Sequence, residues 1–329
     1  MFLSAWSAEL KKIAIICAYI ALLIVVLLAG MELGKGRGFP FVDRRGERSI
    51  GIFTGKDPLV LSAPKGVSQP VLTAADVNDR NAHYIADPFL IRYKDQWHMF
   101  FEVKQAGDGH CVIATASSDD GFRWTYGKVV IDEPFTISYP YVFESDSAVY
   151  MVCETALSYA VRLYKAVDFP YEWKLDAKIL EGIHLDPSIF RYKGHWWIFT
   201  NTKIGEMSAF WADSLKGTWR PHRRNPVVRN DETASRPGGR VIEWNGRLIR
   251  YSQDVEGRYF KAVRAIEVTE LTDSTYTEHP LQPDPVIGPT GKGWNTTGMH
   301  QCDVHPYGDG TWIACVDGMQ DLIRFGWQY

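Results

Sequence analysis

The sequence lacks a strong excess of charge of either sign. Its 329 residues carry 36 Lys and Arg against 39 Asp and Glu, a formal net charge of -3. Proteins that bind nucleic acid gather basic residues on one surface, so this balance argues against a nucleic-acid partner. Low-complexity tracts are also missing, and 46% hydrophobic with 23% charged residues is ordinary for a globular chain. This composition excludes disorder, collagen and coiled coil as the main structure.

Several motifs of common enzyme classes are absent as well. The chain has no GxGxxG after a predicted strand, no P-loop, no HExxH and no GxSxG. Nucleotide-dependent enzymes, metalloproteases and serine hydrolases therefore lose their usual sequence support. The five cysteines show no CxxC or zinc-ligand spacing. Buried free thiols are favoured over a Cys302–Cys315 disulfide between adjacent strands, and the cysteines do not settle the compartment.

One long apolar run lies near the N-terminus. Residues 13–31 read IAIICAYIALLIVVLLAGM, 19 residues without a charge, which matches the ~20 residues that cross a bilayer. A signal peptide has a shorter apolar region and a small-residue cleavage site, so a single-pass membrane anchor is favoured. The basic residues after the run favour a cytosolic C-terminal domain, whereas short N-terminal anchors often insert the other way. The side of the membrane stays open.

What the chain has in abundance is aromatic side chains and a repeat. Aromatic residues make up 13%, including 12 Trp, and both sheet cores and sugar-binding clefts use such rings. Residues 86–100 read ADPFLIRYKDQWHMF and residues 185–199 read LDPSIFRYKGHWWIF. The two segments align without gaps and share Asp-Pro, Arg-Tyr-Lys, Trp and Phe. Each contains two apolar runs around a polar turn, which predicts a β-hairpin.

Weaker copies of this unit begin near residues 138, 235 and 298. Prolines recur at intervals of about 50 residues, at Pro88, Pro140, Pro187 and Pro237. Units of this length with four strand-like runs are typical of propeller blades. The last unit is short, so residues 49–63 are expected to supply its outer strands and close the ring. The predicted fold class is all-β, with an N-terminal tail (1–12), a transmembrane helix (13–31), a stalk (32–48) and a five-bladed β-propeller (49–329).

Polar residues mark the positions that converge at one face of a propeller channel. These positions are the starts of innermost strands and the ends of second strands, which run back to the same face. The candidates at strand starts are Asp87, Tyr139, Asp186, Arg236, Arg240 and His300. The candidates at strand ends are Glu102, Glu154, Gln253, Asp254 and Asp317. The alternative explanation is that strand ends are polar because they are exposed.

Asp87 and Asp186 occupy equivalent places in the two best repeats, and paired carboxylates at a channel mouth suit glycosidic chemistry. One would act as base or nucleophile, and Glu154 is a candidate acid. Arg236 and Arg240 could bind an anionic group. The alternatives are Asp-Pro turns for the aspartates, an ion pair with an arginine for Glu154, and charge balance of the acidic ring for the arginines.

The remaining candidates are expected to bind substrate: Glu102, Tyr139, Gln253, Asp254, His300 and Asp317. His300 could bond sugar hydroxyls, hold a water on a channel cation, or be a structural histidine. No cofactor is expected, although a channel cation such as calcium stays open. The expected partners are a glycan or glycolipid substrate and the membrane.

Several strings resemble a known family. The openings ADPF and LDPSIF resemble five-bladed propellers of the glycoside hydrolase family 43 type. The set VLTAADVNDRNAHYIADPF, SYPYVFE, LYKAVDFPYEW, SRPGGR and SQD is similar to the family-43-like propeller that forms the N-terminal domain of glucosamine inositolphosphorylceramide transferase. The resemblance covers about residues 49–320. It implies a propeller in which Asp87 is the general base and Asp186 tunes the pKa of the acid.

The chain departs from the hydrolase pattern at one place. In family 43 hydrolases the general acid is a Glu in an E-x-P context, where this chain has Ser235-Arg236-Pro237, and Glu232 is out of register. Nothing in the sequence looks like the glycosyltransferase domain of the transferase. Three hypotheses therefore remain. They are an enzyme that hydrolyses or transfers a glycosyl group, a non-catalytic glycan-binding module for a glycosyltransferase system, and a protein-interaction propeller, which the acidic channel disfavours.

Overall fold

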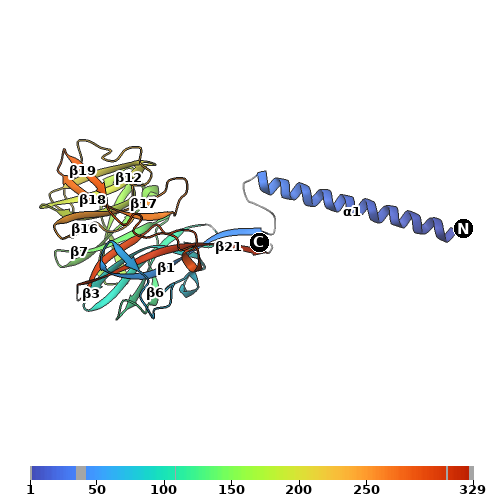
Figure 1. Ribbon diagram of the computed structural model, residues 1–329, viewed down its shortest axis with the longest axis horizontal. Helices are drawn as coiled ribbons and strands as arrows, with labels where there is room; N and C mark the ends of the chain where they lie inside the picture. The colour runs from blue at the N-terminus through green and yellow to red at the C-terminus, as the bar shows by residue number, and fades with distance from the viewer. Residues whose placement is uncertain (1, 35–41, 108, 309, 326–329) are drawn as a thin grey trace. The chain divides into compact units, whose positions relative to one another are not determined.

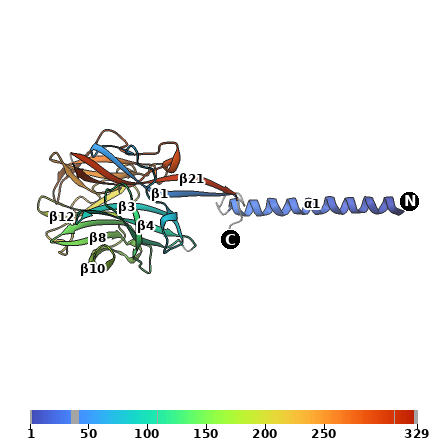
Figure 2. The same ribbon diagram turned by 90° about the horizontal axis from the view of Figure 1, so that it is seen from below.

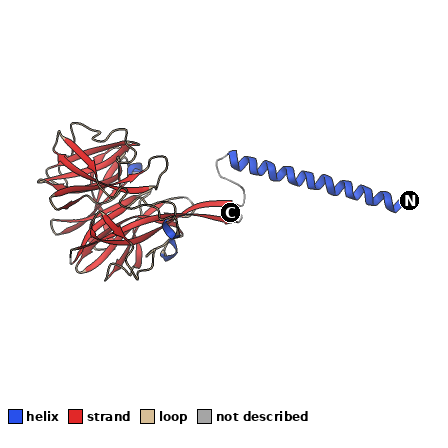
Figure 3. Cartoon of the chain, in the orientation of Figure 1, coloured by secondary structure: helices blue, strands red, loops and turns tan. Residues whose placement is uncertain are grey.

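The computed structural model describes the chain except residues 1, 35–41, 108, 309 and 326–329. The described chain forms two units, residues 47–320 and residues 1–46 with 321–329. Figure 3 shows the long N-terminal helix, and strands with short helical turns elsewhere. The short turns are 3₁₀ segments: η1 (Ala74–Asp76), η2 (Ala156–Ser158) and η3 (Gly293–Asn295).

The long helix, α1 (Phe2–Gly34), contains the predicted membrane segment. Residues Leu10–Leu28 are long and apolar enough to cross a bilayer, and a signal sequence near the N-terminus would have the same features. Helix α1 also includes residues 2–12 of the expected tail and residues 32–34 of the expected stalk. Residues 42–48 of that stalk belong to a strand, and residues 35–41 lie outside the described residues.

The propeller consists of five antiparallel sheets, here numbered as blades by their innermost strands (Figure 1). Blade 1 contains β3 (Ala82–Tyr93), β4 (Gln96–Gln105), β5 (Cys111–Ser118) and β6 (Thr125–Ile131). Blade 2 contains β7 (Ser138–Ser145), β8 (Ala148–Glu154), β9 (Ala160–Asp168) and β10 (Glu172–Glu181). Blade 3 contains β11 (Leu185–Tyr192), β12 (His195–Lys203), β13 (Glu206–Ala212) and β14 (Arg220–Pro221).

The last two blades are less regular. Blade 4 contains β15 (Arg236–Pro237), β17 (Arg247–Asp254), β18 (Ala262–Leu271) and β19 (Tyr276–Pro280), and β16 (Ile242–Trp244) also pairs with β17. Blade 5 contains β20 (Cys302–Gly308), β21 (Thr311–Phe325), β1 (Val42–Asp57) and β2 (Val60–Ser62). The predicted all-β, five-bladed propeller is confirmed.

The N-terminal strands close the ring. Strand β1 lies between β21 and β2 in blade 5, and Figure 2 shows β1 beside β21. Residues 49–63 therefore complete the last blade, as the sequence predicted. Because β1 pairs with β21, strand β21 is not left as an unpaired edge of the sheet. The Tyr251 hydroxyl of blade 4 donates a hydrogen bond to the Pro58 carbonyl oxygen, 2.8 Å away, which fixes the turn after β1.

The core consists of layers between neighbouring blades. Innermost strands are covered on both faces, so their apolar residues form near-continuous runs rather than alternating ones. Phe89 of blade 1 packs on Tyr139 and Tyr141 of blade 2, with ring centroids 4.8 and 5.0 Å apart. The same cluster continues into blade 3 through Ile189 and Ile198. Such aromatic contacts explain why so many rings are needed in this chain.

Three tryptophans in or just before outer strands are structural too, because they pack against the core clusters. Each indole N–H donates to a carbonyl oxygen three or four residues earlier, at 2.9–3.1 Å, in Trp124, Trp173 and Trp219. The four propeller cysteines are buried free thiols, as favoured from the sequence: Cys111, Cys153, Cys302 and Cys315.

Because β1 closes the ring, substitutions at its buried positions should destabilise the folded propeller. Ile52 is fully buried in it, whereas Val60 in β2 is 59% exposed. We expect Ile52→Ala to lower the free energy of unfolding by about 2–5 kcal/mol, because it removes buried surface and leaves a cavity. Val60→Ala should change it by less than about 0.5 kcal/mol. Denaturant unfolding of the full chain in detergent, followed by tryptophan fluorescence, measures both. Equal effects would contradict the role of β1 in closure.

Candidate functional site

Three innermost strands share one backbone conformation at the channel mouth. Asp87, Tyr139 and Asp186 each precede a proline and adopt a left-handed conformation, with φ of 53°, 52° and 48°. The strand register shifts at the same place in all three blades. A left-handed non-glycine residue costs on the order of 1–3 kcal/mol and is concentrated at functional sites. All three residues contact blades other than their own, which places them at the propeller axis.

Asp87 belongs to a carboxylate–imidazole–carboxylate group formed by blades 1 and 5. His300 lies between the two acids, with Nδ1 2.8 Å from Asp317 Oδ2 and Nε2 3.3 Å from Asp87 Oδ1. The Asp87 backbone N–H also donates to Asp317 Oδ2, at 3.1 Å. The imidazole stacks on Phe260 with centroids 3.9 Å apart, and its Nε2 lies 2.9 Å from the Tyr259 hydroxyl. These contacts fix the ring plane of His300.

Asp186 belongs to a second group, formed by blades 2, 3 and 4. Its backbone N–H donates to Glu154 Oε2 at 3.0 Å. Its Oδ2 accepts a short hydrogen bond from Arg236 Nε and one of 2.7 Å from Gln253 Nε2. Gln253 is held in turn by the Pro237 carbonyl oxygen, 2.7 Å away. The structure thus brings together four residues predicted for the site.

The two groups are close enough to influence each other's protonation. Burial raises the pKa of Asp87 well above its usual value, and the charges of Glu102, Asp186, Asp317 and Glu154 raise it further. Burial also raises the pKa of Glu154, with the charge of Asp186 next, although Arg236 opposes the shift. Desolvation and like charges both disfavour ionised carboxylates. Asp87 and Glu154 are therefore the two carboxyl groups most disposed to carry a proton.

The side chain of Tyr139 is buried and forms hydrogen bonds with residues of other blades. Its buried hydroxyl shares a 2.8 Å hydrogen bond with Ser188 Oγ and accepts one of 2.9 Å from the Gly239 N–H. Gly239 has φ of 150°, and a Cβ there would lie 1.9 Å from the Cys302 carbonyl oxygen. No other residue fits this close approach without backbone movement. These contacts favour a structural role for Tyr139 over substrate binding.

Arg240 is also tied into the scaffold. Its Nε donates to Asp303 Oδ1 at 2.8 Å, and its terminal nitrogen donates to the carbonyl oxygens of Leu90 and Val142 at 3.1 and 2.9 Å. These bonds link blades 1, 2, 4 and 5, and only 14% of the side chain is exposed. Arg236 pairs with Asp186 instead, so the two arginines of the predicted anion clamp each already have an aspartate partner.

The other two predicted carboxylates have different surroundings, since Glu102 lies near Asp87 and Asp254 does not pair with the channel groups. Glu102 is buried beside the channel, where it accepts a 2.8 Å hydrogen bond from Cys111 Sγ and acts electrostatically on Asp87. Asp254 pairs instead with Lys261 and Arg264, at 3.2 and 2.8 Å. These partners lie in the following loop and strand of blade 4, so Asp254 stabilises that blade.

A cation could be held by Asp87, His300 and Asp317, whose ligand atoms all lie within 4.8 Å of one another. Two carboxylates and an imidazole suit a transition metal, whereas calcium prefers six to eight oxygen ligands. Asp317 already accepts backbone hydrogen bonds from Asp87 and His300, which leaves it fewer lone pairs. The donor set therefore fits a three-ligand transition-metal site better than the calcium site considered from the sequence.

Sequence reasoning missed an aromatic and basic layer above these carboxylates. The Arg48 guanidinium lies over the rings of Tyr84, Phe260 and Tyr259, at 4.2, 4.8 and 5.6 Å from their centroids. Arg236 lies 5.0 Å from the Tyr259 centroid. Arg48 was assigned to the stalk, although it directly precedes the segment predicted to close the ring. Such a strand has to start near the mouth, and that signal could have identified it.

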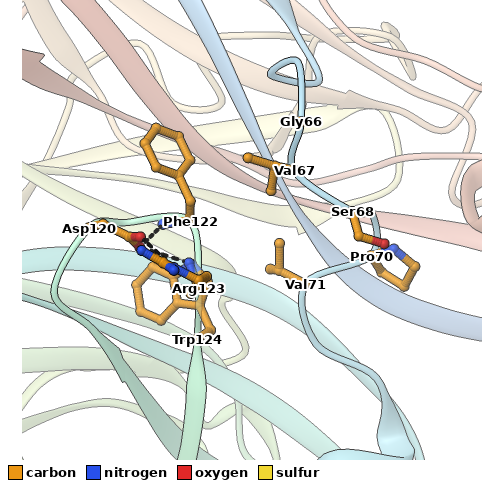
Figure 4. A pocket seen from close by; sticks show the side chains of 9 residues that line it. All are labelled: Gly66, Val67, Ser68, Pro70, Val71, Asp120, Phe122, Arg123 and Trp124. Carbon is orange, nitrogen blue, oxygen red and sulfur yellow. Dashed lines mark hydrogen bonds and ion pairs between the residues drawn. The ribbon is translucent and has the colours of Figure 1, made fainter.

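A surface cavity lies elsewhere in the propeller. It has a volume of about 540 Å³ and lies between residues 66–71 and the turn at 120–124. Figure 4 shows its lining, including Phe122 and Trp124, with Arg123 paired to Asp120 at 2.8 Å. It contains none of the predicted site residues, so the channel remains the candidate site.

Solved structures of other proteins are similar to this propeller. Among solved structures, a putative glycoside hydrolase from Parabacteroides distasonis superimposes with a TM-score of 0.58 at 10% identity, over 77% of this chain and 95% of that one. The catalytic domain of a GH62 alpha-L-arabinofuranosidase from Coprinopsis cinerea gives 0.54 at 12% identity, over 83% and 96%. At such low identity these similarities show the fold alone.

Sequence relatives are more similar. Glucosamine inositolphosphorylceramide transferase 1 of Oryza sativa subsp. japonica is 32% identical over 300 residues, which is 84% of this chain and 40% of the relative. The Arabidopsis thaliana protein of that name is 31% identical over 303 residues, 84% and 39%. The chain thus spans about 40% of the length of these relatives. Residues 41–319 match the family described as glucosamine inositolphosphorylceramide transferase 1, N-terminal, and the chain belongs to that family.

Proposed function

We propose that the propeller binds a sugar residue of a glycolipid or related glycoconjugate in its channel and hydrolyses or transfers it. The observation that carries this proposal is the convergence of Asp87, Glu154 and Asp186 from three blades, two of them with raised pKa values. Carboxyl groups with different protonation are what glycosidic chemistry needs. The name of the relatives, a transferase of glucosamine and inositolphosphorylceramide, supports a glycolipid as the substrate class.

Glu154 is the proposed acid. It is less buried than Asp87, its raised pKa favours the protonated form, and its carboxyl lies beside the Asp186 backbone N–H. In the E-x-P pattern of the related hydrolases the glutamic acid corresponds to Ser235 of this chain, and the neighbouring Arg236 guanidinium does not donate a proton at physiological pH. It instead pairs with Asp186. Proton donation therefore moves to a different blade in this chain.

Asp87 is the proposed base or nucleophile. Its raised pKa means that it must first lose a proton, and the imidazole of His300 lies 3.3 Å away as the acceptor. Asp317, bonded to the opposite nitrogen of the ring, would stabilise the imidazolium that results. The carboxylate of Asp87 is then free to attack or to activate water.

A second candidate function is glycan binding without turnover, as an accessory module of a glycosyltransferase system. The absence of that glutamic acid from Ser235-Arg236-Pro237, where Arg236 is paired with Asp186, favours it. The share of about 40% of the relatives' length is consistent with a module that serves another catalytic domain. The two functions differ in whether a bound glycoside is changed.

The first prediction concerns Asp87→Asn in the full chain in detergent. A screen of glycans and glycolipids should find a ligand that the wild type binds and converts. The variant should retain binding within a few-fold and lose at least about 100-fold in turnover, because the amide cannot act as base or nucleophile. Asp146→Asn, in the exposed turn between β7 and β8, is the matched control and should behave as wild type.

The outcomes separate the two functions. Binding without turnover in wild type and variant alike would overturn the enzyme and leave the binding module. Turnover that survives in Asp87→Asn would remove Asp87 from the mechanism. Failure of every glycan and glycolipid to bind would contradict both functions.

The second prediction concerns pH. The pKa of Glu154 is higher in the folded than in the unfolded chain, so its contribution to stability is complete below about pH 4, the unfolded value. That contribution is lost as pH rises through the folded value. Relative to wild type, Glu154→Gln should therefore gain thermal stability as pH rises from about 4 to 9. Melting curves across this range measure the difference, and parallel curves would contradict the raised pKa.

A further inference from the structure

Exposed apolar side chains gather at one end of the propeller. Among the described propeller residues, nine large apolar side chains are exposed. Five of them belong to what we call the apolar rim: Leu157, Tyr159, Ile183, Ile204 and Tyr259, exposed by 75, 66, 57, 74 and 43%. They come from three different blades, so no single sequence segment accounts for them. Clusters of this kind mark interaction surfaces in soluble domains.

Strand direction places the rim on the face where the channel opens. Each innermost strand starts at the mouth, and neighbouring strands in a blade are antiparallel. Loops between second and third strands, and links between blades, therefore return to the mouth. Leu157, Tyr159, Ile204 and Tyr259 lie in loops of the first kind, and Ile183 lies in the link from β10 to β11.

The chain that leads from α1 reaches the propeller on the same face. Glu47, near the start of β1, accepts a 3.3 Å hydrogen bond from Gln320 near the end of β21. The next residue, Arg48, lies over Tyr84 and Phe260 at the mouth. Leu28, which ends the apolar stretch of α1, precedes Glu47 by 19 positions. That length of chain spans at most about 65 Å.

We propose that the apolar rim rests in the headgroup region of the membrane that α1 enters, so that the channel opens onto lipid headgroups. Leucine and isoleucine gain by leaving water at such an interface, and tyrosine is enriched there because its ring is apolar and its hydroxyl polar. The short tether keeps the rim near the bilayer, which compensates for the small apolar area. The proposal does not depend on catalysis, because an inactive module would dock in the same way.

Blade 2 offers a matched pair of positions for the test. Leu157 lies at the mouth end of the blade, whereas Val167 lies near the far end of β9 and is 60% exposed. Leu157→Cys, Ile204→Cys and Val167→Cys are each labelled with an environment-sensitive fluorophore. The background carries Cys17→Ala, because Cys17 is exposed and the four propeller thiols are buried. The full chain is labelled in detergent and reconstituted into phosphatidylcholine vesicles with or without spin-labelled lipid.

The fluorophore at both rim positions should shift to the blue in vesicles, and spin-labelled lipid should quench it several-fold more than at Val167→Cys. Equal quenching at the three positions would overturn the proposal. A blue shift at the rim without quenching by spin-labelled lipid would also overturn it, since a protein surface, such as a second copy of the chain, would then cover the rim.

Discussion

The carboxylate of Asp317 is the contact on which the channel depends. It is completely buried, and it accepts hydrogen bonds from the backbone N–H groups of Asp87, His300 and Gln301. A buried charge is tolerated only when its lone pairs are satisfied in this way. The same bonds join the first blade to the last and orient the imidazole of His300. They also leave a negative charge beside Asp87, which is one reason why that acid holds its proton.

The same left-handed backbone conformation carries different side chains in different blades. The left-handed residue before proline is an aspartate in blades 1 and 3 and a tyrosine in blade 2. The aspartates enter the two carboxylate groups, whereas Tyr139 bonds Ser188 and Gly239 inside the scaffold. The repeat therefore places equivalent residues around the channel axis. The identity of each side chain determines whether that residue belongs to the candidate site or to the scaffold.

The repeat made most of the fold predictable. The Asp-Pro openings located the innermost strands, and the short last unit required residues 49–63 as its outer strands. The site was predicted as a set of positions, and Asp87, Glu154, Asp186 and Asp317 do meet. The sequence could not show that Arg240 binds Asp303 or that Asp254 binds Arg264, because the first pair depends on how blades 4 and 5 pack and the second on the register of two strands within blade 4. Arg48 was missed because its segment resembles a linker when its pairing with a distant strand is unknown.

Closure of the ring by β1 also has a consequence for biosynthesis. The ribosome releases β1 before the four blades that separate it from its partner β21. During translation the strand must wait unpaired, with its backbone groups available to wrong partners. A nascent chain of this design needs either a chaperone on that strand or rapid folding of the intervening blades, and loss of β21 would leave a ring that cannot close.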